Sequence, residues 1–208
     1  MKIAYQGIEG SYSESCARKK YPDCKTFISC KTFDEVFDKA DENENIMAII
    51  PESNKTTGNI GVEYLIFKYR LNICAEHFYT IRHHLLGLPG TKLEDIKNVY
   101  SHAQGLSQCS NFIKKNSLIE NVRADTAGSA KYISVNKDKK EAAIASKESA
   151  KIYNLDVLAS NIEDEKENVT RFLIFSKKIL QPDLDKNKYI TSLLFKLKDK
   201  PAALYSAL

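Results

Sequence analysis

The sequence has few of the residues that mark metal sites and disulfide frameworks. Its 208 residues include five cysteines, which form no C-x-x-C pair, and four histidines, which form no H-E-x-x-H motif. An odd number of cysteines in apolar or helical contexts does not favour a disulfide framework. The missing spacings argue against a zinc site. We therefore expect no metal and a reducing compartment.

Long apolar runs and nucleotide-binding motifs are also missing. No run of 18 apolar residues occurs, so we expect no membrane span. Met1-Lys2 leads directly into an apolar segment, which leaves no room for a signal peptide, so we expect a cytoplasmic protein. The stretch G7-I-E-G10 has neither phosphate-binding spacing, and no G-x-S-x-G occurs. Nucleotide cofactors and serine-esterase chemistry are not expected, and we predict no cofactor.

The charge distribution argues against two classes of partner, nucleic acids and membranes. The net charge of +4 comes from 31 basic and 27 acidic residues scattered along the chain. No Lys/Arg run is dense enough to predict binding to nucleic acid or to a membrane. With 43% apolar residues, five prolines and eight glycines, the chain is typical of a soluble globular protein with one core or two small lobes. The small positive excess suits an anionic small molecule.

The order of the apolar segments predicts an α/β fold. Short apolar runs alternate with amphipathic stretches, which is typical of parallel or mixed sheets covered by helices. The expected strands are 3–5, 26–28, 46–50, 71–81, 99–100, 122, 142–145, 157–158 and 172–175, and the expected helical segments are 12–21, 33–40, 60–69, 103–115, 127–134 and 147–153.

The chain leaves one compact unit and returns to it. Segment 71–86 is too long and too polar for one central strand, so we expect it to pass to a second unit, and the chain returns near 158–170. Two α/β lobes connected in this way enclose a cleft, where small ligands bind. Segment 177–188 is polar and contains Pro182, which indicates a linker.

Helix caps provide the first candidate binding residues. S11-Y-S-E14 and S101-H-A-Q104 match the capping-box pattern, Asp125-Thr126 precedes A-G-S-A, and Ser146 precedes K-E-S. Capping alone explains each one. Several helix N-termini at one rim would nevertheless favour an anionic ligand with a carboxylate.

The histidines and the Thr-Arg pair have ordinary explanations as well as functional ones. We expect His77, His83 and His84 to be surface or cap residues, and His102 is the best functional candidate among the histidines because it follows a predicted cap. In N168-V-T-R-F-L-I-F175, Thr170 favours extended backbone and Arg171 can face water.

Seven pieces of the sequence, taken in order, resemble the prephenate dehydratase family. Together they span about residues 3 to 175, so the resemblance covers nearly the whole first part of the chain. They are A4-Y-Q-G-I-E-G-S-Y-S-E14, V99-Y-S-H-A-Q-G-L-S-Q-C109, D125-T-A-G-S-A-K131, A142-A-I-A-S146, Y153-N-L-D-V-L158, N161-I-E-D164 and N168-V-T-R-F-L173.

The resemblance implies a domain organisation. The family has a two-lobed catalytic domain similar to type II periplasmic binding proteins, followed by an ACT-type regulatory domain that senses phenylalanine. It implies a catalytic domain at 1–177, with lobe 1 at about 1–77 plus 160–177 and lobe 2 at about 78–159. It also implies a linker at 178–189 and an incomplete ACT domain at 190–208. The apolar strand 190–197 would expose a sticky edge, so we expect a homodimer or homotetramer.

The resemblance also implies a reaction and its residues. Family members convert prephenate to phenylpyruvate, water and carbon dioxide in phenylalanine biosynthesis. Thr170 would donate to the leaving hydroxyl, Arg171 would bind a carboxylate, and Asn168 would orient this turn. The further substrate-binding candidates are Ser11, Asn54, Ser101, His102, Gln104, Thr126 and Phe172.

Two departures from the family pattern leave alternatives open. The family expects P-I-E-N-S-x-x-G, but this chain has P51-E-S-N-K-T-T-G58, with Ser53 in place of the glutamate and Lys55 in place of the serine. The family also expects S-H-P-Q-A, but this chain has S101-H-A-Q-G105, with Ala103 in place of the proline and Gly105 in place of the alanine. A relative that acts on arogenate, one that only decarboxylates, or a non-catalytic module that binds an aromatic acid are therefore alternatives to a prephenate dehydratase.

Overall fold

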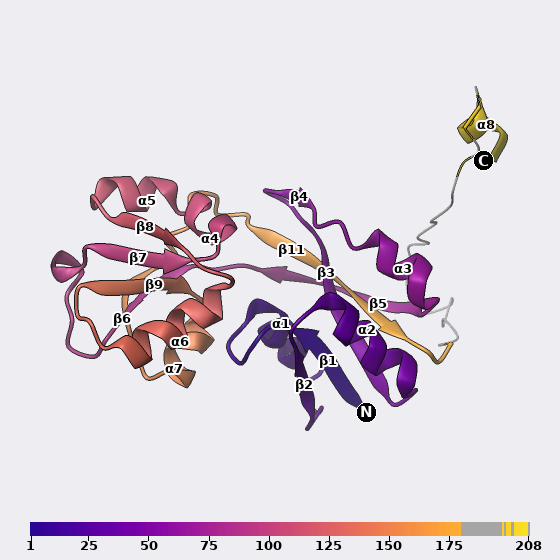
Figure 1. The fold of residues 1–208 in the computed structure, drawn as a ribbon, viewed down its shortest axis with the longest axis horizontal. Coiled ribbons are helices and arrows are strands. Elements are labelled where there is room, and N and C mark those ends of the chain that lie inside the picture. The colour runs from indigo at the N-terminus through magenta and orange to yellow at the C-terminus, as the bar shows by residue number, and fades with distance from the viewer. Residues whose placement is uncertain (180–196, 198, 201, 208) are drawn as a thin grey trace.

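The computed structural model describes residues 1–179, 197, 199–200 and 202–207, and in this part the chain forms two α/β lobes (Figure 1). The α/β class and the two-lobed organisation expected from the sequence are confirmed. The expected linker and ACT segments lie largely outside the described residues. A short helix, α8 (Ala203–Ala207), falls within the expected ACT segment.

The first lobe contains the sheet β2-β1-β3-β11-β5, with β4 paired to β3. Strands β1, β2 and β3 are parallel, whereas β11 is antiparallel to both β3 and β5. The strands are β1 (Lys2–Gln6), β2 (Phe27–Cys30), β3 (Ile46–Asn54), β4 (Gly58–Asn59), β5 (Asn72–Thr80) and β11 (Val169–Ser176), and the helices are α1 (Tyr12–Lys20), α2 (Phe33–Glu42) and α3 (Glu63–Tyr69).

The second lobe contains the sheet β10-β6-β9-β7-β8. Its strands are β6 (His84–Gly87), β7 (Asn98–Ser101), β8 (Ile119–Val122), β9 (Glu141–Ala145) and β10 (Asp156–Ser160); its helices are α4 (Ala103–Ser107), α5 (Ser110–Lys115), α6 (Thr126–Asn136) and α7 (Lys147–Ile152), with a 3-10 turn η1 (Leu93–Asp95).

Apolar side chains on both faces of each sheet form the cores. Residues 46–50 of β3 are all buried, as expected for a central strand covered on both faces. In the first lobe, one face of the sheet packs against Cys16 and Ala17 of α1, and the other against Val36 and Phe37 of α2. The second lobe likewise buries one apolar cluster on each face of its sheet.

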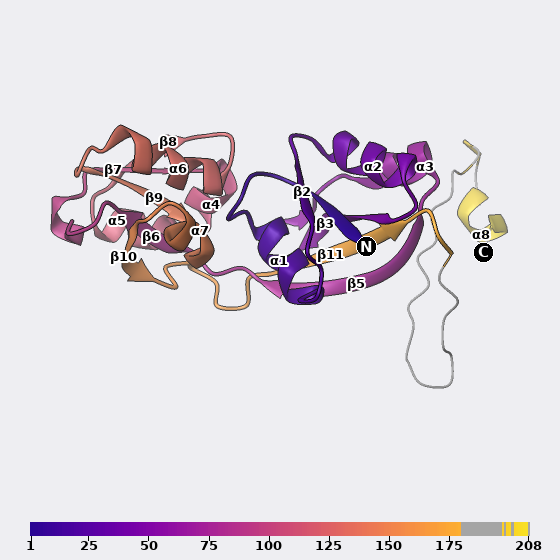
Figure 2. The same cartoon turned by 90° about the horizontal axis from the view of Figure 1, so that it is seen from below.

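Two segments connect the lobes, and they are hydrogen-bonded to each other. Residues 81–83 lead from β5 to β6, and residues 161–168 lead from β10 back to β11, so segment 71–86 passes between the lobes as predicted. Ile81 N–H donates to Asn168 O at 2.8 Å, and Ile162 N–H donates to His83 O at 3.0 Å. Figure 2 shows β5 and β11 side by side as they run toward this junction.

A third contact joins the lobes away from these connections. Gly10 O, in the loop before α1, accepts from Ser146 Oγ at 2.7 Å and from Ser149 Oγ at 3.0 Å, at the start of α7. Tyr153 Oη, just after α7, donates to Glu9 O at 2.7 Å. The loop after β1 is therefore docked against α7 of the second lobe.

Three of the predicted caps are confirmed. Ser11 Oγ accepts from Glu14 N, Asp125 Oδ1 accepts from Gly128 N, and Ser146 Oγ accepts from Ser149 N.

The prediction that Ser101 caps a helix is wrong. Helix α4 begins one residue later, and its cap is His102, whose Nδ1 accepts from Gln104 N at 3.2 Å. Ser101 is fully buried and instead donates from Oγ to Ile144 O at 2.7 Å, across to the neighbouring strand.

The single helix predicted over 103–115 is also wrong, because two short helices, α4 and α5, occupy this range. The Asp164 carboxylate accepts from Asn111 N and from Ser110 Oγ, and so provides a separate cap for α5. The break places Gln108 between the two helices, at the edge of the interlobe cavity.

Candidate active site

A cavity of about 650 Å³ lies between the lobes. The first lobe lines it with the segments that follow β1 and β2, the end of β3 and the start of β11. The second lobe lines it with α4 and the start of α6. The cavity therefore lies beyond the carboxyl ends of the parallel strands β1, β2 and β7, where open α/β sheets commonly bind ligands.

Thr170 lies at this cavity and is held by a neighbouring strand. It pairs with Asn54 across β11 and β3, and Asn54 Nδ2 donates to Thr170 Oγ1 at 2.9 Å. The same nitrogen donates to Asn168 Oδ1 at 2.8 Å. Thr170, Asn54 and Asn168 are 6%, 5% and 1% exposed, so a small buried group of polar side chains fixes the threonine hydroxyl.

The orientation of the Asn54 amide is set by the loop that follows it. Asn54 Oδ1 accepts from Thr56 N at 2.9 Å and from Thr57 N at 3.1 Å. Backbone N–H groups can only donate, so this end of the amide must be its oxygen. The hydroxyl of Thr170 then accepts from Asn54 and keeps its own hydrogen for another partner.

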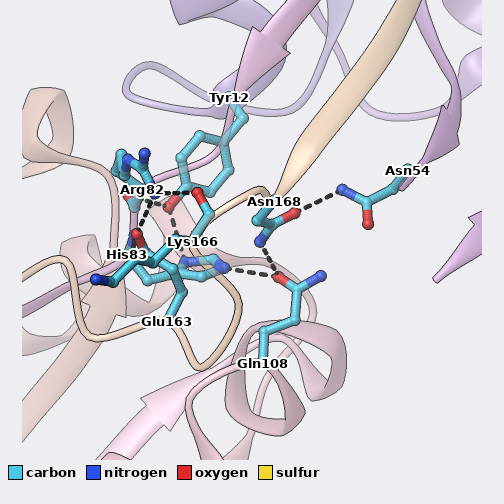
Figure 3. A network of polar contacts seen from close by, with 8 residues as sticks. All are labelled: Tyr12, Asn54, Arg82, His83, Gln108, Glu163, Lys166 and Asn168. Carbon is cyan, nitrogen blue, oxygen red and sulfur yellow. Dashed lines mark hydrogen bonds and ion pairs between the residues drawn. The ribbon is translucent and has the colours of Figure 1, made fainter. Parts of the chain in front are cut away.

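Three residues without a predicted role extend this group: Gln108 after α4 of the second lobe, His83 on the connection between the lobes, and Tyr12 on α1 of the first lobe (Figure 3). Asn168 Nδ2 donates to Gln108 Oε1 at 2.9 Å, and Gln108 Oε1 lies 2.8 Å from His83 Nε2. Tyr12 Oη donates to Arg82 O at 2.9 Å and lies 2.8 Å from His83 Nδ1. Tyr12, His83 and Gln108 all line the cavity.

His83 is not the surface residue expected from the sequence. It is 2% exposed, and its backbone N–H donates to Glu163 Oε2 at 2.9 Å. Burial lowers the pKa of His83 below the ordinary value, while the hydrogen bond to Gln108 and the Glu163 charge oppose this shift. Burial also raises the pKa of Tyr12 well above the ordinary value for tyrosine. Both side chains are therefore neutral near pH 7.

Arg171 does not reach the cavity. Its Nε donates to Glu76 Oε2 at 2.8 Å, and its Nη1 lies 3.5 Å from Glu52 Oε2. Neighbouring residues of a strand point to opposite faces of the sheet, so Arg171 and the cavity-facing Thr170 cannot share a site. In this arrangement the Arg171 guanidinium is paired with two glutamates outside the cavity, so it is not placed for the expected contact with a substrate carboxylate.

Glu52 provides a carboxylate one position before the glutamate of the family pattern. A β-bulge between Arg171 and Phe172 leaves Glu52 without a partner residue in β11, because Arg171 pairs with Ser53 and Phe172 with Pro51. The carboxylate of Glu52 faces Arg171 and accepts from Ser53 Oγ at 2.6 Å. An acid is thus present in this loop, but it pairs with arginine on the face of the sheet that carries Arg171.

Most of the other predicted site residues are brought together. Ser11, Asn54, His102, Gln104, Thr126 and Phe172 all line the cavity together with Thr170. Gln104 Nε2 also contacts Thr57 Oγ1 across the two lobes. Ser101 does not line the cavity, because its buried hydroxyl donates to β9.

The cavity lining contains no formal cation among the described residues. None of its side chains is lysine or arginine, while Asp34 and Asp125 are both present. Hydrogen bonding to the Lys68 ammonium lowers the pKa of Asp34 below the ordinary value. An anionic ligand here would depend on hydroxyl and amide donors and on the N-terminal ends of α1 and α6.

Within the described residues, no group of three or more His, Cys, Asp or Glu side chains is placed to hold a metal ion. The five cysteines are free. Of the helices that the structure describes, none has the length and apolar character needed to cross a membrane.

Comparison with known proteins identifies the family. The family model for prephenate dehydratase matches residues 3–179. The chain belongs to the prephenate dehydratase family. The resemblance found in the sequence motifs is confirmed.

Curated relatives of this chain include plant enzymes. Arogenate dehydratase 2 of Petunia hybrida is 42% identical over the whole chain, which covers 52% of that relative. The arogenate dehydratase/prephenate dehydratase 2 of Arabidopsis thaliana is 38% identical, also over the whole chain and 54% of the relative. The chain thus spans about half the length of the curated relatives it matches.

Solved structures also match the fold. A structure described as GqqA, a novel type of quorum quenching acylase, has a TM-score of 0.82 and 28% identity, covering 100% of this chain and 75% of its own. The prephenate dehydratase of Staphylococcus aureus has a TM-score of 0.72 and 27% identity, covering 86% of this chain and 68% of its own.

The expected cytoplasmic location is contradicted by the plant relatives. Four Arabidopsis thaliana proteins that are 36% to 40% identical to this chain are described as chloroplastic. These relatives are plastid proteins, so the cytoplasmic expectation is not supported. The sequence argument failed because neither the apparent lack of a signal peptide nor the cysteine content distinguishes one reducing compartment from another.

Proposed function

We propose that this chain carries the catalytic part of a dehydratase that acts on prephenate or on arogenate, its amino-acid counterpart. The observation that carries the proposal is the state of Thr170 at the interlobe cavity. Its oxygen accepts from Asn54, so its hydrogen is available to a group bound in the cavity. Membership of the prephenate dehydratase family supports the same reaction.

The reaction requires one proton donor and no electron-accepting cofactor. The bond between the ring and the carboxylate breaks and releases carbon dioxide, and its electron pair enters the ring. The ring hydroxyl leaves with the electron pair of the broken C–O bond and takes up a proton to become water. Aromatisation drives both steps. Thr170 donates that proton and regains one from solvent once the products have left, and donation of this kind contributes roughly 10²- to 10⁴-fold.

Asn54 makes the Thr170 hydroxyl a better donor in two ways. A hydrogen bond accepted by the oxygen polarises the O–H bond, and it also fixes the direction of the hydrogen. The Asn54 amide has no remaining freedom, because its oxygen is held by the loop and both of its hydrogens are used. In this proposal Arg171 does not contact the substrate. Its ion pairs with Glu52 and Glu76 help to hold β11 in position.

The carboxylates of the substrate are held by neutral donors. The hydroxyls of Ser11 and Thr126, together with the amide of Gln104, face the cavity from both lobes. The N-terminal ends of α1 and α6 add favourable partial charge. Phe172 supplies an apolar surface for the ring, and His102 lies at the rim as the cap of α4.

Arogenate is the second candidate substrate, and one feature of the cavity favours it. Prephenate carries two negative charges, whereas arogenate also carries an ammonium group and has one net negative charge. The described lining has two aspartates and no lysine or arginine, which suits the less negative substrate. Several plant relatives are described as arogenate dehydratases.

The experiment is a steady-state assay of the 208-residue chain on both substrates, with Thr170→Ala as the control. We expect phenylpyruvate from prephenate and phenylalanine from arogenate, with the higher kcat/KM for arogenate. Binding of both compounds without turnover would instead indicate a non-catalytic binding module. Release of carbon dioxide without loss of the hydroxyl would indicate a decarboxylase.

An acylase reaction like that of the GqqA neighbour is not proposed. Attack by a hydroxyl requires a base beside it. Both ring nitrogens of His83, the buried histidine at the cavity, are occupied by Tyr12 and Gln108.

We also propose the domain assignment implied by the family. Residues 1–177 form the catalytic domain, with lobe 1 at about 1–77 plus 160–177 and lobe 2 at about 78–159. Residues 178–189 are a linker, and 190–208 belong to an ACT-type regulatory domain, the type that senses L-phenylalanine. A homodimer or homotetramer would cover the apolar segment 190–197, which lies largely outside the described residues. Size measurement in solution and an assay with phenylalanine on a lengthened chain test these points.

A further inference from the structure

Prephenate and arogenate differ at one carbon of the side chain, where prephenate carries a ketone oxygen and arogenate carries an ammonium group. A ketone oxygen only accepts hydrogen bonds, whereas an ammonium group only donates them and is positively charged. A carboxylate facing this carbon would therefore attract arogenate and repel the ketone of prephenate. The residue that distinguishes the two compounds should be an acid of the cavity lining.

Asp34 is one of the two acids in the described lining, and both of its oxygens already have partners. Oδ1 accepts from Lys68 Nζ at 2.6 Å, and Oδ2 accepts from Tyr64 Oη at 3.2 Å. The Lys68 ammonium thus balances the charge of Asp34. This acid is poorly suited to bind a second ammonium group.

Asp125, the other acid of the lining, has one oxygen without a partner. Oδ1 accepts from Gly128 N as the cap of α6, but Oδ2 forms no hydrogen bond or ion pair within the described part of the chain. The nearest basic residue in the sequence, Arg123, has its guanidinium over the ring of Tyr132, 4.1 Å from the centroid. Within the described lining, Asp125 therefore offers a carboxylate whose charge no ion pair balances.

Gly128 leaves the space that this carboxylate occupies. A Cβ at residue 128 would lie 2.7 Å from Asp125 Oδ2 and 3.1 Å from Asp125 Oδ1. Real side chains essentially never approach a neighbour as closely as the first distance, so any larger residue would displace the carboxylate. The sequence at the start of α6 thus holds Asp125 against the helix, beside Thr126.

The residue after Asp125 supplies the complementary group. Thr126 also lines the cavity and, with the N-terminal end of α6, is a donor for a substrate carboxylate in the proposed function. In the side chain of arogenate, the ammonium and one carboxylate are attached to the same carbon. Adjacent residues at one helix start therefore provide an acceptor for the first group and a donor for the second.

The shape of the substrate directs its side chain toward this lobe. The leaving hydroxyl and the side chain are attached to opposite carbons of the ring, so a substrate whose hydroxyl meets Thr170 extends its side chain away from Thr170. Thr170 lies on β11 of the first lobe, whereas Asp125 immediately precedes α6 of the second lobe (Figure 1). Both residues line the cavity that separates them.

We propose that Asp125 binds the ammonium group of arogenate through Oδ2 and so gives the site its preference for arogenate over prephenate. The proposal rests on the proposed function for the identity of the two compounds, and it names the residue that selects between them. The preference is then a property of one carboxylate and not of the total charge of the lining.

Asp125→Asn is the first test. Asparagine caps a helix as well as aspartate does. Because Gly128 N–H only donates, the amide turns its oxygen toward Gly128 and its Nδ2 donors toward the place of Oδ2. We expect the ratio of kcat/KM for arogenate to kcat/KM for prephenate to fall roughly 10- to 100-fold. Steady-state kinetics of the 208-residue chain measure this ratio, and an unchanged ratio would overturn the proposal.

Asp125→Ser covers the case in which Asp125→Asn does not fold. Serine is also a favoured cap and can accept from Gly128 N, but it has no carboxylate. The same fall in the ratio is expected. A ratio that stays at the wild-type value would count against Asp125 in this variant too.

Asp34→Asn is the matched comparison, because it removes the same charge from the same cavity lining. The Lys68 ammonium that it leaves unpaired is exposed to solvent and screened. We expect the ratio between the substrates to change less than threefold. A shift as large as that of Asp125→Asn would show that the total charge of the lining, and not Asp125, selects the substrate.

Binding measurements separate this proposal from the proposed function. Calorimetry compares the Kd values of arogenate and prephenate for Thr170→Ala and for Thr170→Ala/Asp125→Asn, in which turnover is slow. The second variant should bind arogenate roughly 10- to 100-fold more weakly relative to prephenate. No binding of arogenate to Thr170→Ala, or an equal change for both compounds, would overturn the assignment. The expected binding pattern without turnover in the wild type would refute the proposed function alone.

Discussion

The two lobes contribute to the cavity in different ways. Besides Ser11 at the start of α1, the first lobe provides the hydroxyl of Thr170, which is held in a buried row of amides. The second lobe provides groups near the ends of helices, such as Thr126 at the start of α6 and the exposed cap His102. A reacting group needs one fixed direction, whereas a charged substrate can be held by several donors around a rim. The first lobe should therefore control kcat and the second mainly KM.

The largest effect is expected at Thr170. Thr170→Ala removes the donor and should lower kcat roughly 10²- to 10⁴-fold, while Thr170→Ser keeps the hydroxyl and much of the activity. Steady-state kinetics on prephenate and arogenate measure both variants. Wild-type rates for both would remove Thr170 from the reaction and end the distinction between the lobes.

The next effect concerns the contact that brings the lobes together. Gly10 has φ +87°, and a Cβ there would lie 2.6 Å from Ser149 Oγ and 3.0 Å from Ser149 Cα. Gly10→Ala should therefore lower the free energy of unfolding by about 2–3 kcal/mol and raise KM, as urea unfolding and kinetics would show.

Gly58→Ala is the matched control for this substitution. Gly58 has a similar φ of +81°, but a Cβ there meets nothing within 4 Å. Gly58→Ala therefore introduces the same backbone strain as Gly10→Ala but does not disturb a contact between the lobes. Equal losses in the two variants would show that the docking of Gly10 on α7 contributes nothing.

A smaller effect is expected at Arg171, on the opposite face of β11 from Thr170. Arg171→Met leaves Glu52 and Glu76 without their cation and should lower the free energy of unfolding by about 1–2 kcal/mol. Adding Glu76→Gln should restore part of it. We expect kcat of the single variant to stay within about threefold. A loss of kcat like that of Thr170→Ala would show that the guanidinium does reach the substrate.

Thr126 tests the contribution of the second lobe. Thr126→Val has a similar shape but lacks the hydroxyl that faces the cavity. We expect KM to rise by up to about 10-fold with kcat nearly unchanged, as for loss of one hydrogen bond to a bound substrate. A fall in kcat with a constant KM would contradict the division of roles between the lobes.

The smallest effect is expected from pH, through the histidines at the junction. Burial lowers the pKa of His83 and of His84 below the ordinary value of 6.5. Between the folded and unfolded pKa values the unfolded chain binds more protons. The stabilisation that depends on these neutral histidines is therefore complete above pH 6.5. The free energy of unfolding falls as the pH drops below that value. Urea unfolding on both sides of pH 6.5 should show a smaller fall for His83→Gln than for the wild type, and an equal fall would exclude His83 as a source.

Sequence patterns predicted most of the elements and several caps, because these depend on near neighbours, but they missed β4 and β6. The apolar run 46–50 and the caps at Ser11, Asp125 and Ser146 were recognisable from the residues around them. The break between α4 and α5 was not, because the cap of α5 comes from Asp164, more than 50 residues later in the chain.

The site was predicted in part, and one error was avoidable. Thr170, Asn54 and Asn168 lie together as the family resemblance implies. The alternation of side chains along a strand already indicates that Thr170 and Arg171 face opposite sides. Gln108 and His83 could not be found in this way, because the hydrogen bond between them joins positions 25 residues apart and the amide row then crosses to the first lobe.

The position of β11 has a consequence for the order in which the protein forms during synthesis. The second lobe is one continuous stretch of chain, and its sheet is complete once β10 has left the ribosome. The sheet of the first lobe still lacks the strand between β3 and β5 at that time. Domains generally fold as units while the chain is being made. The nascent protein therefore gains Thr170, the proposed proton donor, in the same step as the last strand of the first-lobe sheet, so the proposed reaction would have to wait until the first lobe closes.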